Sequence, residues 1–475
     1  MKLPLLCALI ALVSGGRSTQ QTGEERQTAD LRPNLVLLVT DDHPFDALGS
    51  AGHPVLRTPH LDGLAERGVR FTHAFVTTPI CAASRASLFT GRYERAHGYT
   101  FGQPALDAAL VRESYPVLLR EAGYRVGFVG KFGVRVRAED RAAMFEEDAP
   151  GTYPYLPRAK NDAEAEGDGE PARHLTERNT DRAIEFVQRD DPRPFCLSFS
   201  FQAPHAEDHN PEQFVWPESC DDLYEDAELP TPANADPAFF EALPEFLRTG
   251  LNRERWGWRF DTPEKHDRMV KGYYRMLSGV DLAVGRLLAA LDEAGLRERT
   301  VVVVIGDNGY FLGERGYAGK WTMHDRSTRV PLLFRDPRRA DSTSARVIDA
   351  FALNVDVAPT LLELAGVETP EGMQGRSLVP LLDGEVDALR EDVFTEHLWR
   401  NPRIPRTEGL RTRGWKYIRY PDHPEYEELY DLTADPEEGQ NLATDERHAE
   451  RLRDLRERAA GAAKRVGRPE RESDR

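Results

Sequence analysis

Cysteine is scarce in this sequence. Among 475 residues only four cysteines occur, at Cys7, Cys81, Cys196 and Cys220. Small extracellular domains that cannot build a large core rely on dense disulfides, and so few cysteines exclude that class. Cys196 lies in an apolar run and Cys220 in an expected loop, so whether these two pair stays open. Cys81 is left without an evident structural role.

Long apolar runs are also lacking. The chain begins with a positive Met1-Lys2, an apolar stretch from Leu3 to Val13 and the small residues Ser14-Gly15-Gly16. This stretch is too short for a bilayer, which needs ~20 apolar residues, but it has the order of a secretory signal. We predict a signal peptide at residues 1–18 and an exported protein, periplasmic or extracellular, with no membrane span.

Positive charge is in deficit. The chain has 62 Lys and Arg against 80 Asp and Glu, a formal net charge of −18. Proteins that bind nucleic acid carry basic patches, so this balance argues against a nucleic-acid partner. An anionic substrate would have to be met by a local cluster of cations.

Several short apolar runs each end in polar residues. Runs rich in β-branched residues, with no polar alternation, are typical of strands covered on both faces. Helical patterns at residues 61–67 and 273–294 lie between them. We therefore predict the α/β class, a mostly parallel sheet sandwiched by helices. The runs are Asn34–Thr40, Tyr124–Val129, Phe195–Phe201 and Val301–Ile305.

We expect two structural units after the signal peptide. An α/β domain is predicted at residues 31–385, and a smaller C-terminal subdomain with a small antiparallel sheet and a terminal helix at residues 386–475. Residues 138–173 are expected to form a surface insertion. Residues 206–268 are expected to form long loops that wall a substrate cleft.

Polar residues gather where the predicted strands end. Asp41-Asp42, Lys131, His205 and Asp307-Asn308 each follow one of the runs. Ligands of parallel α/β sheets bind beyond the carboxyl ends of the strands, so these residues are candidates for one site. Three carboxylates and an amide oxygen suit Ca²⁺ or Mg²⁺. Each pair has an alternative role as a helix cap or an Asx turn.

The segment from Cys81 to Arg92 reads Cys-Ala-Ala-Ser-Arg-Ala-Ser-Leu-Phe-Thr-Gly-Arg. Cys81 precedes an expected helix start, and Arg85 follows one turn later. A helix N-terminus favours anions, and arginine adds a bidentate oxyanion donor. Taken alone, Cys81 would be a buried cysteine at a loop-to-helix junction.

The whole segment resembles the signature of the type I sulfatases, in the alkaline-phosphatase-like superfamily. That family carries Cys-x-(Pro or Ala)-x-Arg followed by Thr-Gly-Arg, matched here by Ala83 and by Thr90-Gly91-Arg92. The resemblance extends from about Pro33 to Ala443 and implies that a maturation enzyme oxidises Cys81 to formylglycine. It implies one Ca²⁺ per chain, with Mg²⁺ as the alternative, held by Asp41, Asp42, Cys81, Asp307 and Asn308.

The resemblance also implies catalytic roles. Arg85, Lys131 and Lys320 would bind the sulfate oxygens, and His205 would protonate the departing alcohol. One position departs from the family: Gly133 stands where a histidine usually contacts the formylglycine.

The predicted function is therefore a sulfuric ester hydrolase acting on a sulfated carbohydrate. Trp216, Trp256 and Trp258 are available to stack on sugar rings. One alternative is a phosphomonoester or phosphodiester hydrolase of the same superfamily, for which a Ser or Thr nucleophile and zinc-type ligands would be expected. The other is a non-catalytic binder of sulfated glycans, which Gly133 favours.

Overall fold

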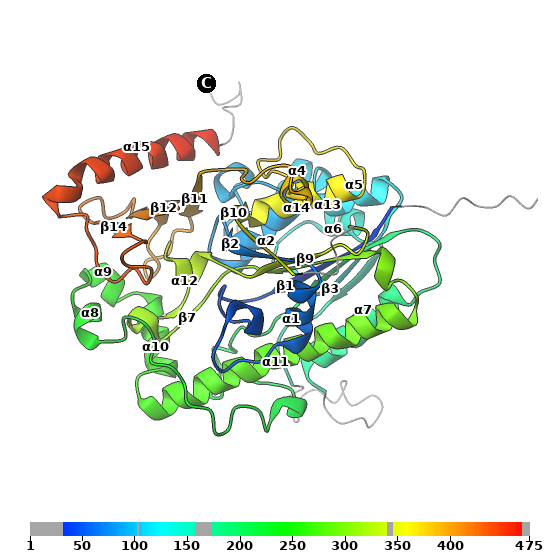
Figure 1. Ribbon diagram of the computed structural model, residues 1–475, viewed down its shortest axis with the longest axis horizontal. Coiled ribbons are helices and arrows are strands. Elements are labelled where there is room, and N and C mark those ends of the chain that lie inside the picture. Colours follow the sequence, from blue (N-terminus) through cyan, green and yellow to red (C-terminus); the bar gives the residue numbers. More distant parts are fainter. Residues whose placement is uncertain (1–31, 102–103, 157–172, 340–344, 468–475) are drawn as a thin grey trace, which may run out of the picture. The chain divides into compact units, whose positions relative to one another are not determined.

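The computed structural model describes residues 32–101, 104–156, 173–339 and 345–467 (Figure 1). The predicted signal peptide at residues 1–18 lies outside these ranges, as do residues 157–172 of the predicted insertion.

A sheet of eight strands organises the described chain, in the spatial order β10-β2-β9-β6-β1-β5-β3-β4. Neighbouring strands run parallel, except that β9 is antiparallel to both β2 and β6. The predicted α/β class with a mostly parallel sheet is confirmed. The strands are β1 (Asn34–Thr40), β2 (Val69–Phe75), β3 (Arg125–Gly130), β4 (Glu147–Pro150), β5 (Phe195–Ser200), β6 (Thr300–Gly306), β9 (Leu332–Arg335) and β10 (Arg346–Leu353).

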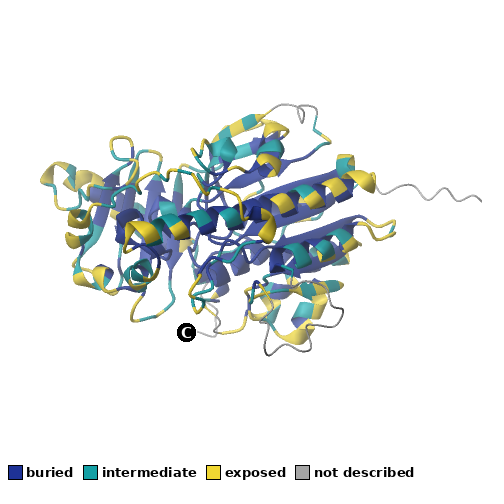
Figure 2. Cartoon of the chain, turned by 90° about the horizontal axis from the view of Figure 1, so that it is seen from below, coloured by how far each residue is buried: buried dark blue, intermediate teal, exposed yellow. Residues whose placement is uncertain are grey.

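Helices cover both faces of the sheet because the central strands are apolar on both faces. On β1, Leu35 and Leu37 belong to one apolar cluster, while Val36 and Leu38 belong to another. Side chains alternate across a strand, so each cluster fills one face. Figure 2 shows the buried sheet between helices with exposed outer sides. The first cluster includes side chains of α2 (Cys81–Thr90), α5 (Tyr115–Glu121) and α13 (Val357–Leu364), and the second those of α1 (Pro59–Glu66), α7 (Leu175–Val187) and α11 (Pro263–Glu293).

A separate antiparallel sheet of four strands forms the C-terminal part, as predicted. Helix α15 (Ala449–Arg465), the predicted terminal helix, joins its core through Leu452 and Leu455. The strands are β11 (Asp392–His397), β12 (Thr407–Thr412), β13 (Trp415–Arg419) and β14 (Glu427–Asp431).

Asp325 ties this small sheet to the main one. It begins α12 (Asp325–Thr328), and its Oδ1 lies 3.0 Å from Nε of Arg411 on β12. Lys416 of β13 forms a second ion pair with the same carboxylate. All three side chains are buried, so the two sheets meet through a paired charge cluster and not through apolar packing alone.

Long loops are predicted for residues 206–268, and this prediction is wrong for the second half of the segment. It contains α8 (Pro237–Glu241), α9 (Glu245–Arg248) and α10 (Leu251–Arg259), and α11 starts at Pro263, ahead of the predicted Tyr273. Residues three apart are neighbours on a helix, and the guanidinium of Arg253 lies 3.7 Å from the ring centroid of Trp256. Cation–π stacking of this kind stabilises α10 despite its charge.

The remaining elements are short. Part of the predicted insertion at residues 138–173 belongs to the main sheet, because it contains the edge strand β4. Within the described ranges, no helix combines the length and apolar character needed to cross a bilayer. Cys196 and Cys220 are both free thiols, and burial raises the pKa of Cys196 to about 12. The short elements are α3 (Glu94–His97), α4 (Ala108–Arg112), α6 (Ala138–Met144), α14 (Val379–Asp383), β7 (Phe311–Leu312) and β8 (Ala318–Gly319).

Candidate active site

The strand ends bring most of the predicted site residues together. In the register of the sheet, Thr40 at the end of β1 pairs with Gly306 at the end of β6. Asp41-Asp42 and Asp307-Asn308 therefore leave the sheet side by side. Gly130 of β3 pairs in the same way with Ser200 of β5, which brings Lys131 near the segment that leads to His205.

Two lysines neutralise the Asp41-Asp42 pair. Lys131 forms an ion pair with Asp41, and Lys320 forms one with Asp42 while its Nζ lies 3.8 Å from Oδ1 of Asp41. Burial raises the pKa of Asp41, but Lys131 and the neighbouring cations lower it by more than burial raises it. The pKa of Asp41 therefore falls well below the usual range. Burial lowers the pKa of Lys320, yet Asp42 and the other anions raise it above its ordinary value. These directions favour the charged forms of Asp41 and Lys320.

Arg85 contacts the Asp307 side of the cluster. Its Nε donates to Oδ2 of Asp307 at 2.7 Å, and its Nη1 donates to the carbonyl of Lys131 at 2.5 Å. Arg85 also donates to the hydroxyl of Ser200 and, from Nη2, to the carbonyl of Phe201 at 3.5 Å. Burial and the nearby Asp41 raise the pKa of Asp307 to about 6. The guanidinium is thus held by four fixed acceptors and cannot easily rotate away.

Three buried oxygens in the cluster have no hydrogen-bond partner among the described residues: Oδ1 of Asp41, Oδ2 of Asp42 and Oδ1 of Asn308. The Asn308 amide nitrogen donates to Oδ1 of Asp42 at 2.6 Å and to the Gly309 carbonyl at 2.9 Å, which fixes which side of the amide is the oxygen. Buried polar atoms are normally paired, and oxygen ligands of this kind suit a hard cation. The donor set fits Ca²⁺ or Mg²⁺.

The backbone at Asp42 supports the same arrangement. Asp42 has φ 51°, in the left-handed region that non-glycine residues rarely adopt. The hydroxyl of Tyr273, from α11, donates to the Asp42 carbonyl at 2.6 Å and holds the turn in place. Strained backbone clusters at functional sites. No pattern in the sequence connects Tyr273 to Asp42.

Cys81 is the first residue of α2 and lies within the same cluster of charges. Its thiol is free and the residue is only 7% exposed. Cys81 is among the neighbours that raise the pKa of Arg85, of Lys131 and of Lys320, against the lowering effect of burial. Ile80 holds the N-cap position and offers no side-chain acceptor. The first N–H groups of α2 are therefore left for an anion.

Asn354 bonds to residues before and after Cys81 in the sequence and so fixes the position of Cys81. Its Oδ1 accepts from the backbone N–H of Thr77 at 3.0 Å, and its Nδ2 donates to Oγ of Ser84 at 2.9 Å. Asn354 is fully buried at the end of β10. It links the loop before Cys81 to the first turn of α2, and sequence reasoning missed it because a single distant asparagine carries no signal.

His205 lies at the edge of the cluster. Its Nε2 is 3.8 Å from Oδ2 of Asp42, and its Nδ1 lies 2.8 Å from the carbonyl of Ala206. The hydroxyl of Tyr153 contacts the same Nδ1. Burial lowers the pKa of His205 to about 4, although Asp42 and Asp41 raise it. Tyr153 was also missed, because it lies in the expected insertion.

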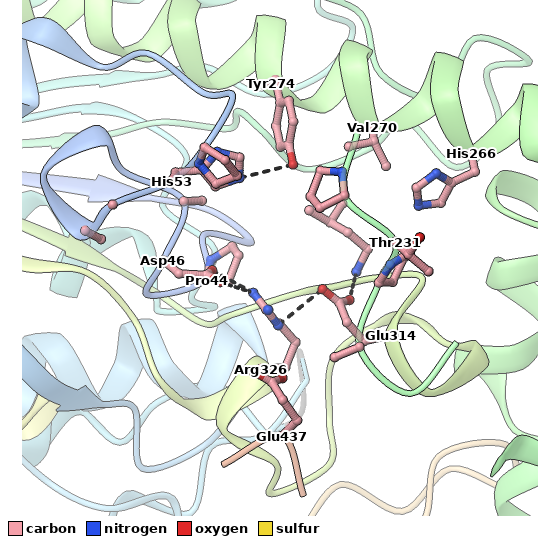
Figure 3. Close-up of a pocket in the computed structure, with 18 residues that line it drawn as sticks. Pro44, Asp46, His53, Thr231, His266, Val270, Tyr274, Glu314, Arg326 and Glu437 are labelled. Carbon is pink, nitrogen blue, oxygen red and sulfur yellow. Dashed lines mark hydrogen bonds and ion pairs between the residues drawn. The ribbon is translucent and has the colours of Figure 1, made fainter. Parts of the chain in front are cut away.

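A separate cavity of about 330 Å³ lies next to this cluster (Figure 3). Arg326 occupies its floor, where Nη1 donates to both carboxylate oxygens of Asp46 at 2.6 and 2.7 Å and Nε lies 3.2 Å from Glu314. None of the predicted site residues lines it. This cavity is distinct from the candidate active site.

Two family profiles match the chain. One described as Sulfatase matches residues 33–367, and one described as N-sulphoglucosamine sulphohydrolase, C-terminal, matches residues 313–465.

Curated relatives match over nearly the whole length. An N-acetylglucosamine-6-O-sulfatase of Bacteroides thetaiotaomicron is 28% identical, with 95% of this chain and 89% of that protein covered. An arylsulfatase of Clostridium perfringens is 26% identical, with 90% and 93% covered.

Solved structures share the fold. One, of a protein in complex with its substrate D-glucosamine-2-N,6-O-disulfate, has a TM-score of 0.77 at 24% identity, with 92% of this chain and 98% of that chain covered. The phosphonate monoester hydrolase of Agrobacterium radiobacter also has a TM-score of 0.77, at 22% identity, with 92% and 96% covered.

Proposed function

We propose that this chain, which belongs to the sulfatase family of the alkaline-phosphatase-like superfamily, removes sulfate from a sulfated carbohydrate through a formylglycine at Cys81. It is a sulfuric ester hydrolase. The observation that carries the proposal is the arrangement at the end of the sheet. Three buried oxygens that lack a hydrogen-bond partner among the described residues meet there. Three cationic side chains and a free cysteine at a helix N-terminus join them. The similarity to an N-acetylglucosamine-6-O-sulfatase supports a sugar as the alcohol part of the substrate.

The cation would be held by Asp41, Asp42, Asp307 and Asn308 together with the modified Cys81. When bound, Ca²⁺, or Mg²⁺ as the alternative, supplies a Lewis acid that lowers the pKa of a coordinated hydroxyl. A maturation enzyme would first oxidise Cys81 to the aldehyde, whose hydrate supplies that hydroxyl as the nucleophile.

Arg85, Lys131 and Lys320 would bind the three sulfate oxygens that do not react. Each side chain stays protonated despite burial, because the neighbouring anions raise its pKa. Fixed cations stabilise the charge that spreads over a transferring group, as they do in phosphoryl transfer. Because Arg85 is held by four acceptors, it would position the sulfate without reorganising.

His205, as the imidazolium, would deliver the proton on Nε2 to the oxygen that leaves, and Asp42 and Asp41 favour this charged form against the effect of burial. The bond between sulfur and the sugar oxygen breaks, the sugar leaves as a neutral alcohol, and one water is consumed overall to give sulfate. Tyr153 and the Ala206 carbonyl both contact Nδ1, so Nε2 is the nitrogen that faces the cluster. General acid catalysis of this kind is typically worth ~10²–10⁴-fold.

The phosphonate hydrolase neighbour supports one alternative, a phosphoester hydrolase on the same fold. Cysteine at position 81 and the sulfatase profile favour sulfate. A non-catalytic glycan binder is the second alternative, and it rests on Gly133. Export to the periplasm or the extracellular space is part of the proposal, and it rests on residues 1–18.

Peptide mass spectrometry across Cys81 tests the proposal, on protein from a host that matures sulfatases. We expect a loss of about 18 Da from the Cys81 peptide, as thiol is replaced by aldehyde. Cys196 is the internal control, because it is also a free buried cysteine and should keep its mass. The matured protein should hydrolyse sulfated sugars, and Cys81→Ala should not. An unmodified Cys81 in active protein would contradict the proposed nucleophile.

A further inference from the structure

A second charged cluster adjoins the candidate active site next to His205. Asp208 follows His205 by three residues, and its carboxylate forms ion pairs with Arg255 and Arg259 of α10. Burial raises the pKa of Asp208, but the two arginines and His205 lower it, and the lowering prevails. Two guanidinium groups face one carboxylate, so this cluster carries one positive charge in excess.

Helix α10 fixes this cluster relative to Lys320. Asn252 of α10 donates to the Lys320 carbonyl at 2.8 Å. The guanidinium carbon of Arg255 lies 4.9 Å from the ring centroid of Trp321, the residue after Lys320. Arg255 therefore contacts Trp321, the residue after Lys320, and Asp208, three residues after His205.

The two arginines have different surroundings. Arg259 is fully buried, and its Nη1 donates to the hydroxyl of Tyr310 at 3.1 Å. Among the described residues, the Nε of neither arginine has a hydrogen-bond partner, but Arg255 keeps 11% of its side chain exposed while Arg259 keeps none. The adjoining Asp208 is 23% exposed. Both arginines pair with Asp208, and Arg255 is the one of the two that a ligand can reach from solvent.

We infer that Arg255 binds a second oxyanion, a carboxylate or a sulfate, on the same sugar whose sulfate ester is cleaved, and so selects doubly anionic sugars. This inference rests on the proposed function. A guanidinium presents paired N–H groups that match the geometry of an oxyanion. Asp208 and the Trp321 ring already hold the planar group, so little side-chain freedom is lost when an anion binds. In a chain of net charge −18, local excess positive charge is needed to attract a second anion.

The test compares sugar sulfates with and without a second anionic group on the same ring, together with an aryl sulfate. The panel holds a monosulfated N-acetylglucosamine, a glucosamine disulfate, a monosulfated uronate, and 4-nitrophenyl sulfate. Hydrogen bonds to charged groups are worth enough to change rates by about 10–100-fold. Arg255→Gln should lower kcat/KM by about that factor for the two doubly anionic sugars, and by less than about threefold for the other substrates. Arg248→Gln, at an exposed position in α9, is the matched control and should leave all four unchanged.

The pattern of losses decides the outcome. A loss confined to the disulfate identifies a sulfate as the second anion, and a loss confined to the uronate identifies a carboxylate; both support the inference. An equal loss on all substrates, including the aryl sulfate, would overturn it and make Arg255 structural. No loss on any substrate would overturn it as well. If Arg255→Gln does not fold, Arg255→Lys keeps the charge and should retain an intermediate preference.

Calorimetry separates failure of this inference from failure of the proposed function. With Cys81→Ala protein, the doubly anionic sugars should bind about tenfold more tightly than the monosulfate, and adding Arg255→Gln should remove that preference. A wild-type protein that hydrolyses no sulfate ester would contradict the proposed function, while the binding comparison would still support or overturn the role of Arg255.

Discussion

A Cβ atom placed on Gly133 would lie 2.8 Å from Cδ of Arg85. Gly133 also has φ +71°, a backbone conformation that side chains other than glycine rarely adopt. The sulfatase signature that the sequence resembles has a histidine at this position. Here Arg85 fills the space where that histidine would begin, and Arg85 is itself held by Asp307 and Ser200.

Gly133→His should therefore damage the enzyme and not restore a missing residue. We expect a loss of kcat/KM of at least about tenfold, since displacing Arg85 weakens the stabilisation of the reacting sulfate. Stability should fall by about 1–3 kcal/mol from backbone strain and overpacking. Enzyme kinetics and thermal unfolding measure the two effects.

Gly63→His is the matched control for that substitution. Gly63 lies in α1, has no atom within 4 Å of an added Cβ, and keeps an ordinary helical φ. The control should retain full activity and lose little stability. A gain in kcat/KM for Gly133→His would contradict our account of this position.

Calcium should raise the melting temperature of the protein. The unpartnered oxygens of Asp41, Asp42 and Asn308 are ready to bind a cation, and a ligand at 100–1,000 times its Kd stabilises by about 3–4 kcal/mol. Asp42→Asn should abolish most of the shift. Asp46→Asn is the control, because Asp46 pairs with Arg326 outside the cluster. A melting temperature that changes with neither Ca²⁺ nor Mg²⁺ would refute the proposed metal site.

His174 should make the protein sensitive to acid. Its Nδ1 accepts from the N–H of Thr176 as the N-cap of α7, while its Nε2 donates to the Val215 carbonyl at 3.0 Å. Burial lowers the pKa of His174 to about 4 from an ordinary 6.5. The neutral ring therefore stabilises the fold fully above pH 6.5, and this stabilisation is lost as the pH falls towards 4. The loss is about 3 kcal/mol at most.

His174→Asn removes this titration but keeps a good N-cap. The wild type should be the more stable protein at pH 7.5, and its advantage should shrink as the pH falls to 4. Chemical unfolding of both proteins across that range gives the difference. An advantage that is constant with pH would show that His174 is not the group responsible.

Asn354→Ala should lower both stability and kcat. The variant leaves the N–H of Thr77 and the hydroxyl of Ser84 without their partner, at a cost of about 1–3 kcal/mol. Cys81 would then be less well fixed, so kcat should fall more than KM rises. Asn354→Asp keeps the acceptor for Thr77 and should be intermediate in both measurements. An unchanged kcat in a folded Asn354→Ala protein would argue against a positioning role.

The central strands were readable from the sequence because burial on both faces leaves an unbroken apolar run. β1 coincides with its prediction, and β6 extends one residue beyond it at each end. The sequence analysis missed β2 and β9, each for a different reason. β2 mixes Arg70, Thr72 and His73 into its apolar pattern, and β9 is only four residues long.

Some residues of the candidate site could also be predicted from the sequence, and others could not. Asp41 and Asp307 could be predicted because they follow the strands directly, and the topology of a parallel sheet brings such ends together. Tyr153, Asn354 and Arg255 could not, because each reaches the site from a segment with no fixed distance in sequence from the strand ends. Only the tertiary fold brings these side chains to the cluster.

The ion pairs of Asp325 bear on how such proteins can recombine. Lys320 and Asp325 belong to one short stretch of chain, and Asp325 is bound to Arg411 and Lys416 of the small sheet. The second family profile begins at residue 313, before this stretch, and overlaps the first. A chimera that takes only the small sheet from a relative would leave a buried aspartate facing foreign partners. Exchange should succeed when the cut lies before residue 313, so that Lys320 stays with the small sheet to which Asp325 is bound.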